Sequence, residues 1–194
     1  MFNPKVIDLS EIKDGAILAI DVDYRGDQAF ASGVLFQDWK SAECAVINAQ
    51  IDEVAPYEPG SFWKRELPCI HKLLAELDRL RPGFKLGCIL IDGYVFLDNA
   101  PIPKWGLGGY LNNALAGEIP IVGVAKTHFA GVPDNIKLFR DNSTSPLYVT
   151  ATGRDLEQAR EDAKKNVASM HGLYRMPSML KFVDQCCRNY KGEI

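Results

Sequence analysis

The sequence predicts an α/β protein with a mixed central sheet, and two apolar segments that each end in an aspartate are the first observations behind that prediction. Leu86 to Ile91 is followed by Asp92 and Gly93, and Ala16 to Ile20 is followed by Asp21. A short apolar run bounded by turn residues is typical of a strand buried on both faces. Taken alone, Asp92-Gly93 is better explained as a simple turn. Two buried strands that each end in an acid instead indicate a site for a divalent metal ion.

The order of the predicted elements is the third observation. Three strands are expected at residues 16–24, 28–36 and 43–49, and the turns between them predict an antiparallel meander. Further along the chain we expect a helix capped by Ser61 that ends at Leu80, helices at 107–116, 155–171 and from Pro177 to 189, a strand at 119–124, and a hairpin within 136–150. Strands that alternate with helices at this spacing imply parallel pairing through right-handed crossovers.

This order is that of the ribonuclease-H-like fold, in which helices flank a sheet of three antiparallel strands followed by parallel strands. In that architecture the first strand and the first parallel strand are neighbours. Acids at the ends of these strands then lie where open α/β sheets place their ligands. We therefore expect Asp21 and Asp92 to lie side by side.

Composition limits the class of protein further. The chain has 194 residues, 47% of them hydrophobic, and we expect a single domain over residues 1–194. No apolar segment is long enough to span a bilayer, and residues 1–10 lack the basic-then-apolar order of a signal peptide. We therefore expect a cytoplasmic monomer with no membrane contact. The cysteines are odd in number and lie mostly in apolar segments, so we expect reduced core thiols rather than disulfides. They are Cys44, Cys69, Cys88, Cys186 and Cys187.

The formal net charge of −3 argues against a protein that coats nucleic acid electrostatically, because such binding depends on phosphate neutralisation by Lys and Arg. Basic side chains such as Lys64, Arg65 and Lys126 are compatible with a local patch, although a solvated surface is their ordinary place. Charge alone leaves the partner open.

Neighbouring carboxylates at Asp21 and Asp92 would repel each other and raise each other's pKa unless a cation lay between them. A ligand set of oxygen atoms on a rigid sheet suits Mg²⁺, with Mn²⁺ as a substitute, rather than zinc. A third acid, Glu66, lies near the start of the helix after the meander and is placed to point back at the sheet. On its own, Glu66 is better explained as an exposed helix glutamate.

The stretch that leads to Glu66 extends the pattern. Residues 56–66 read Pro-Tyr-Glu-Pro-Gly-Ser-Phe-Trp-Lys-Arg-Glu, which resembles the Pro-Tyr-x-Pro-Gly-x-x-x-x-Arg-Glu motif of the endonuclease V family. Further segments are similar to motifs of that family and occur in the same order, namely 19–24 (Ala-Ile-Asp-Val-Asp-Tyr), 91–93 (Ile-Asp-Gly), 106–111 (Gly-Leu-Gly-Gly-Tyr-Leu) and 120–126 (Pro-Ile-Val-Gly-Val-Ala-Lys). The resemblance covers most of the chain, from the first strand through Leu156.

The resemblance implies a metal-dependent endonuclease that cuts DNA or RNA at the second phosphodiester on the 3′ side of inosine, a deaminated adenine, in nucleic-acid repair or inosine-RNA processing. Asp21, Glu66 and Asp92 would hold Mg²⁺, and Lys126 would approach the scissile phosphate. The family's Pro-Tyr-x-Pro stretch acts as a wedge beside the lesion. The family also has glycines whose backbones approach the flipped base. The wedge and these glycines together imply the substrate-binding residues Pro56, Tyr57, Pro59, Gly60 and Gly93. Elementary chemistry supports the metal and the lysine independently, although Lys126 can also be a lysine that simply extends from a strand end to solvent.

The chain departs from the family pattern at several positions. Residues 152–156, Thr-Gly-Arg-Asp-Leu, lack the histidine of the family's Gly-His-x-x-Ser-Leu turn, and Tyr94 to Asn99 replaces the His-Pro-Arg expected after Gly93. Asp155 can supply an acidic partner there, but an N-cap of the following helix explains it better. His128, just after Lys126, is a weak candidate for the missing role. The wedge also contains an acid, Glu58.

Three functions remain open from the sequence. The first is an endonuclease of the endonuclease V type, and the second is a nuclease of the same fold with a different substrate. The third is a non-catalytic nucleic-acid-binding module. The complete set of Asp21, Glu66, Asp92 and Lys126 argues against the third, because buried acids that repel one another are costly to keep without a use.

Overall fold

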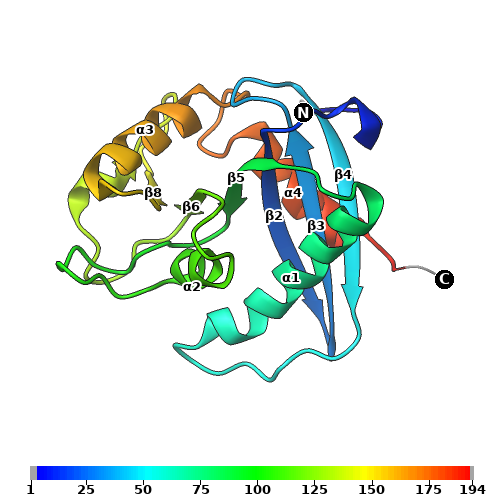
Figure 1. Ribbon diagram of the computed structural model, residues 1–194. Coiled ribbons are helices and arrows are strands. Elements are labelled where there is room, and N and C mark those ends of the chain that lie inside the picture. Colours follow the sequence, from blue (N-terminus) through cyan, green and yellow to red (C-terminus); the bar gives the residue numbers. More distant parts are fainter. Residues whose placement is uncertain (1–3, 193–194) are drawn as a thin grey trace.

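The computed structural model describes residues 4–192 and contains an eight-stranded mixed sheet with helices on both faces (Figure 1). The ends of the predicted domain, residues 1–3 and 193–194, lie outside the described part. The strands are β1 (Lys5–Val6), β2 (Ala16–Arg25), β3 (Gln28–Phe36), β4 (Glu43–Ile51), β5 (Leu86–Ile91), β6 (Ile121–Ala125), β7 (Lys137–Leu138) and β8 (Leu147–Ala151). The α-helices are α1 (Phe62–Leu80), α2 (Leu107–Ala114), α3 (Leu156–Ser169) and α4 (Ser178–Asn189), and short 3₁₀ turns lie at Leu9–Glu11 and Asp134–Ile136.

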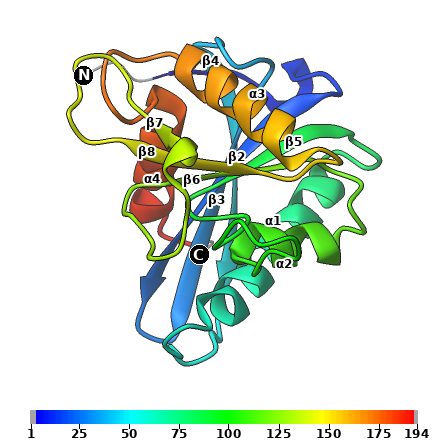
Figure 2. The same ribbon diagram turned by 90° about the vertical axis from the view of Figure 1, so that its left-hand side faces the viewer.

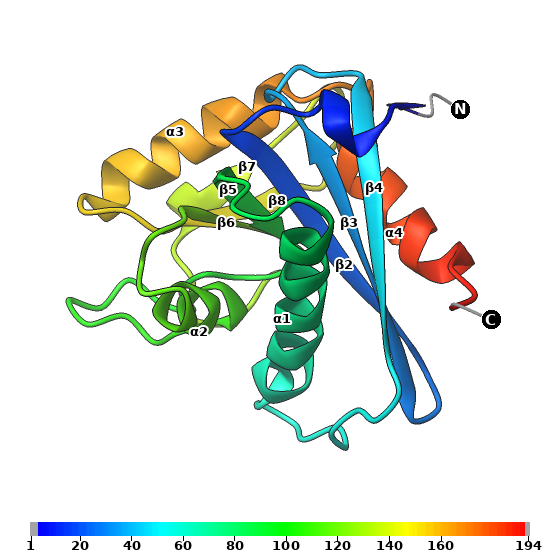
Figure 3. The same cartoon turned by 45° about the vertical axis from the view of Figure 1, so that its right-hand side comes forward.

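The strand order across the sheet is β1-β4-β3-β2-β5-β6-β8-β7. Strands β2, β3 and β4 form the predicted antiparallel meander, whereas β2 pairs with β5, and β5 with β6, in parallel. The predicted hairpin is β7 with β8, and β8 also pairs antiparallel with β6. Figure 3 shows the long meander beside the shorter strands β5, β6 and β8. The predicted ribonuclease-H-like fold is therefore confirmed.

Helices cover the two faces of the sheet in pairs. Strands β5, β6 and β8 lie between α3 on one side and α1 and α2 on the other (Figure 2). One apolar cluster joins α1 and α2 to the sheet, and a second joins α3 and α4 to the opposite face. The close approach of α1 depends on Gly33, because a Cβ atom there would lie 2.8 Å from Leu18 and 3.1 Å from Leu73. The middle strands therefore end between two helical layers.

Some local predictions were wrong. Ser61 is the N-cap residue of α1 as predicted, but its side chain makes no capping bond; its carbonyl accepts from the N–H of Lys64 instead. The short edge strand β1 was missed, since two exposed residues carry no periodic pattern. Helix α2 ends two residues early, where Ala116 adopts a positive φ of 53°.

Two further expectations can be compared with the structure. All five cysteines are free, and four of them are buried, as expected for reduced core thiols. Within residues 4–192 no helix is both long and apolar enough to cross a bilayer.

Candidate active site

Asp21 and Asp92 lie at corresponding positions on neighbouring parallel strands. Ile20 on β2 is in register with Ile91 on β5, so Asp21 and Asp92 lie beside each other. Asp92 follows the end of β5 as predicted, but β2 does not end at Asp21, because its pairing with β3 continues to Arg25. The prediction that these strands are neighbours is confirmed. Both side chains line one small hollow, whose other walls are Ile20, Val124, Lys126, Met176, Leu180 and Val183. We call this space the acidic hollow.

Glu66 is directed at the sheet from α1. Only 7% of its surface is exposed, so the prediction that it points back at the sheet is confirmed and the alternative of an exposed helix glutamate is wrong. The hydroxyl of Tyr24, on β2, donates a hydrogen bond of 2.5 Å to Glu66 Oε2. The guanidinium of Arg65 lies 3.9 Å from the centroid of the Tyr24 ring. Tyr24 therefore holds the Glu66 carboxylate beside β2, three residues beyond Asp21.

The acids perturb one another. Burial, reinforced by repulsion from Asp92, raises the pKa of Asp21 to about 7. Burial also raises the pKa of Glu66 to about 7, with repulsion from Asp21 and Asp92 adding to it, although the Tyr24 hydrogen bond acts in the opposite direction. The folded chain thus holds carboxyl groups where their ionised forms are disfavoured, which a nearby positive charge would relieve.

Lys126 supplies one such charge. At the end of β6, its Nζ lies 2.5 Å from Asp92 Oδ2. Burial disfavours the ammonium, but the hydrogen bond and the charge of Asp92 outweigh burial and raise the pKa of Lys126. Because the ammonium is directed into the acidic hollow, the alternative of a lysine that simply extends to solvent does not describe it.

Asp184, on α4, is a further acid that the sequence analysis missed. Its charge raises the pKa values of both Asp21 and Lys126, and it lines a neighbouring hollow together with Lys126. Asp184 also pairs with Arg188 at 3.0 Å. The only available signal was the i, i+4 spacing from Leu180 on an amphipathic helix, which does not say where that helix packs.

The acids are chemically suited to bind a divalent cation, but they do not form a ready-made coordination site. Among residues 4–192, no three Asp, Glu, His or Cys side chains are gathered closely enough to hold a metal as they stand. Glu66 instead accepts from Tyr24, and Asp92 pairs with Lys126. The donors are nevertheless all carboxylates, they are partly desolvated, and they already draw a cationic side chain among them. Those properties suit Mg²⁺ or Mn²⁺.

The predicted wedge leads directly into α1 and therefore to Glu66. Tyr57 lies in the loop before the helix with 62% of its surface exposed, between Pro56 and Pro59. Glu58 is paired with Lys64 at 2.8 Å, so its charge is offset locally. Gly93 adopts a φ of +149°, a conformation that disfavours any side chain.

The positions that depart from the family pattern have structural partners. Tyr110, within the motif-like segment 106–111, stacks on Trp63 with ring centroids 3.9 Å apart and meets Trp105 edge-on at 5.5 Å. Asp155 accepts hydrogen bonds from two main-chain N–H groups of α3, so the N-cap interpretation is confirmed. His128 meets Tyr148 edge-on and lies near Asp134. It is not among the residues that line the acidic hollow.

The fold and the acidic hollow together define a ribonuclease-H-like protein with a carboxylate site on its central parallel strands β2 and β5. The sequence matches the Endonuclease V family over residues 3–192, and the chain belongs to that family.

Solved structures of endonuclease V are similar to this chain. The protein from Streptomyces avermitilis is 27% identical, with a TM-score of 0.65 over 91% of this chain and 81% of that one. The human protein is 22% identical, with a TM-score of 0.68 over 90% and 83%. The protein from Ciona intestinalis, in complex with a 24mer DNA containing an inosine followed by a ribo-adenosine, is 18% identical, with a TM-score of 0.71 over 93% and 86%. A search of curated proteins finds no match.

Proposed function

We propose that the protein is a metal-dependent endonuclease that cleaves DNA or RNA near inosine, at the second phosphodiester on its 3′ side. The observation that carries this proposal is the pair Asp21 and Asp92 on the neighbouring strands β2 and β5, with the Lys126 ammonium on Asp92 and Glu66 directed at β2 from α1. Family membership and the inosine-containing complex of the Ciona intestinalis protein support it.

Each residue has a definite role in this proposal. Asp21, Glu66 and Asp92 would hold Mg²⁺, with Asp184 as a further oxygen donor beside them. When bound, the ion would polarise a phosphoryl oxygen and activate water. The Lys126 ammonium would offset the negative charge that develops on the phosphate. The hydroxyl of Tyr24 would keep Glu66 directed at the sheet.

The wedge would engage the lesion. The ring of Tyr57 is exposed enough to stack on a base. Pro56 and Pro59 restrict the loop, so little conformational entropy is lost when the ring stacks. The open space beside Gly60 and Gly93, where an added Cβ atom would meet nothing within 4 Å, would admit the displaced base.

One gel assay tests the proposal. An oligonucleotide with a single inosine is incubated with the protein in Mg²⁺ and in Mn²⁺, beside the same oligonucleotide with adenine. We expect cleavage of the inosine substrate at one position and little cleavage of the adenine control. DNA and RNA versions show which backbone is accepted, since contacts to the 2′-hydroxyl distinguish them.

A second candidate is a nuclease of the same fold with another substrate, favoured by residues 152–156 and 94–99, which lack the histidines of the family motifs. Equal cleavage of both oligonucleotides, abolished by Asp92→Ala, would support this candidate. Binding without cleavage in either metal would instead support a non-catalytic module.

A further inference from the structure

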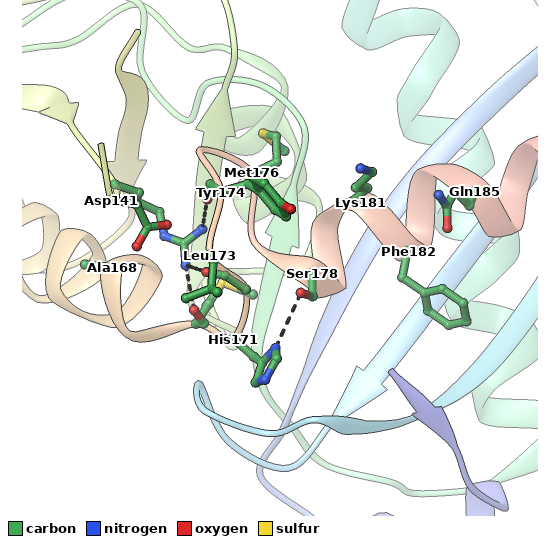
Figure 4. Close-up of a pocket in the computed structure, with 13 residues that line it drawn as sticks. Asp141, Ala168, His171, Leu173, Tyr174, Met176, Ser178, Lys181, Phe182 and Gln185 are labelled. Atoms are coloured by element: carbon green, nitrogen blue, oxygen red, sulfur yellow. Dashed lines mark hydrogen bonds between the residues drawn. The ribbon is translucent and has the colours of Figure 1, made fainter. Parts of the chain in front are cut away.

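A trough runs from the acidic hollow along the start of α4. Lys126, Met176 and Leu180 line both the acidic hollow and a second hollow of about 360 Å³ beside it. Tyr174, Met176 and Lys181 line that second hollow and also a third of about 640 Å³. Figure 4 shows these three side chains following one another from the loop after α3 onto α4. We call this continuous surface the α4 trough.

Tyr174 is an exposed ring on a fixed stretch of backbone. Its surface is 72% exposed, and within residues 4–192 its side chain makes neither a ring contact nor a hydrogen bond. Its carbonyl accepts a bond of 2.6 Å from Arg140, whose other bonds hold the carbonyls of Met170 and Gly172. Arg140 itself is only 5% exposed. An aromatic ring presented in this way is a suitable platform for a nucleobase.

The α4 trough is positively charged in a protein whose net charge is −3. Lys181 is exposed and has no ion-pair partner in the described part of the chain, 4–192. Arg140 and Arg175 donate to main-chain carbonyls, so their charges are not paired with carboxylates. The acids that line the second and third hollows are Asp184, which pairs with Arg188, and Asp141, and Lys126 at the near end pairs with Asp92. This excess of positive charge is complementary to a phosphate backbone.

The position of the trough indicates which part of a substrate it would hold. The wedge loop leads into α1 on one face of the sheet, and α4 packs on the other (Figure 3). Strands β2 and β5, which bring Asp21 and Asp92 to the acidic hollow, belong to the sheet between them. If the lesion is engaged at Tyr57 and the cut lies on its 3′ side, the strand beyond the cut continues toward α4. We propose that the α4 trough binds the nucleic-acid strand 3′ of the cut, with Tyr174 stacked on a base and Lys181 at a phosphate. This inference rests on the proposed function.

The test compares inosine oligonucleotides of different 3′ length. One extends about ten nucleotides beyond the cut, within the usual site size of single-strand binders; the other ends just after it. Binding is measured by fluorescence anisotropy in EDTA, so that the strand stays intact. Wild type should bind the longer strand more tightly, and Tyr174→Ala should lose between about 5-fold and about 150-fold of that advantage. Tyr174→Phe, which keeps the ring, should retain it.

The charged contact has its own measurement. Lys181→Gln should make the salt dependence of log K shallower by about 0.7 for the longer strand. Lys165→Gln, at an exposed lysine of α3, is the matched control and should leave the slope unchanged. An unchanged length dependence in Tyr174→Ala, or a loss confined to strands extended on the 5′ side, would overturn the inference. If wild type cuts no inosine strand in Mg²⁺ but the Tyr174-dependent binding remains, the proposed function fails and the α4 trough stands.

Discussion

Replacing Asp21 by asparagine should stabilise the metal-free protein at neutral and alkaline pH relative to wild type. Burial raises the pKa of the Asp21 carboxyl from 3.8 to about 7 on folding. This rise corresponds to about 4 kcal/mol of stability that wild type has below pH 4 and loses as the pH rises through 7. The value is an upper bound, because Asp21 is partly exposed and its titration is coupled to that of Glu66. Asparagine does not ionise, and its Oδ1 can still accept the bond from the N–H of Val22.

The assay is urea unfolding in EDTA at pH 4 and at pH 8. The difference in unfolding free energy, Asp21→Asn minus wild type, should become more positive between the two pH values, by as much as about 4 kcal/mol. Added Mg²⁺ should raise the stability of wild type at pH 8 by mass action and raise that of the variant much less. The matched control is Asp162→Asn, a change at a surface carboxylate on α3 outside the acidic hollow.

The reasoning that burial and repulsion raise the pKa of Asp21 would be refuted if the difference in unfolding free energy between Asp21→Asn and wild type stayed constant or shrank as the pH rises. A stabilisation by Mg²⁺ that is equal in wild type and Asp21→Asn would place the ion elsewhere.

Three further predictions follow from the same geometry. Asp92→Asn should abolish most of the Mg²⁺-dependent rise in melting temperature, which at 100 times Kd corresponds to about 2.7 kcal/mol in wild type; a thermal shift that survives would remove Asp92 from the metal site. Tyr57→Ala should weaken binding of inosine strands by about 1–3 kcal/mol in anisotropy while leaving the Mg²⁺ thermal shift intact, and an unchanged preference for inosine over adenine would count against the wedge. Gly93→Ala should lower the unfolding free energy by about 1–3 kcal/mol in urea titrations, because a φ of +149° strains any side chain; a neutral effect would show that the turn relaxes.

The positions of Asp21 and Asp92 were predictable because each depends on local sequence alone. An apolar run predicts a buried strand, and the acid that ends the run marks where the strand becomes less buried, which is the end of β5 for Asp92 and the middle of β2 for Asp21. The order of strands and helices then restricts which strands can be neighbours, since parallel strands need a crossover between them. That β2 and β5 are neighbours followed from the strand arrangement of the ribonuclease-H-like fold, whereas their register, which is shifted between Ala16 and Ile17, did not follow from the sequence.

The partners of the site could not be predicted in the same way. The bond from Tyr24 to Glu66 joins residues 42 positions apart, and Arg140 reaches the carbonyl of Tyr174 over 34. Neither pair has a periodic or motif signal, because each forms only after a helix or loop packs on the sheet. Asp184 was missed for the same reason: its helix is amphipathic, but amphipathicity alone does not tell which part of the sheet that helix covers.

Packing of the two helical layers therefore determines the chemistry of the site as much as the acids themselves. The cluster beneath α1 brings Glu66 to the sheet, and the cluster beneath α4 brings Asp184 to the opposite side of the same strands. Apolar burial on both faces supplies free energy in proportion to area, which offsets the repulsion among carboxylates that would otherwise separate them. Lys126 offsets part of that repulsion at Asp92, while the raised pKa values of Asp21 and Glu66 show that the rest remains in the folded chain. A bound cation would remove that remainder, so the hydrophobic contacts that stabilise the fold would also favour cation binding at the proposed metal site.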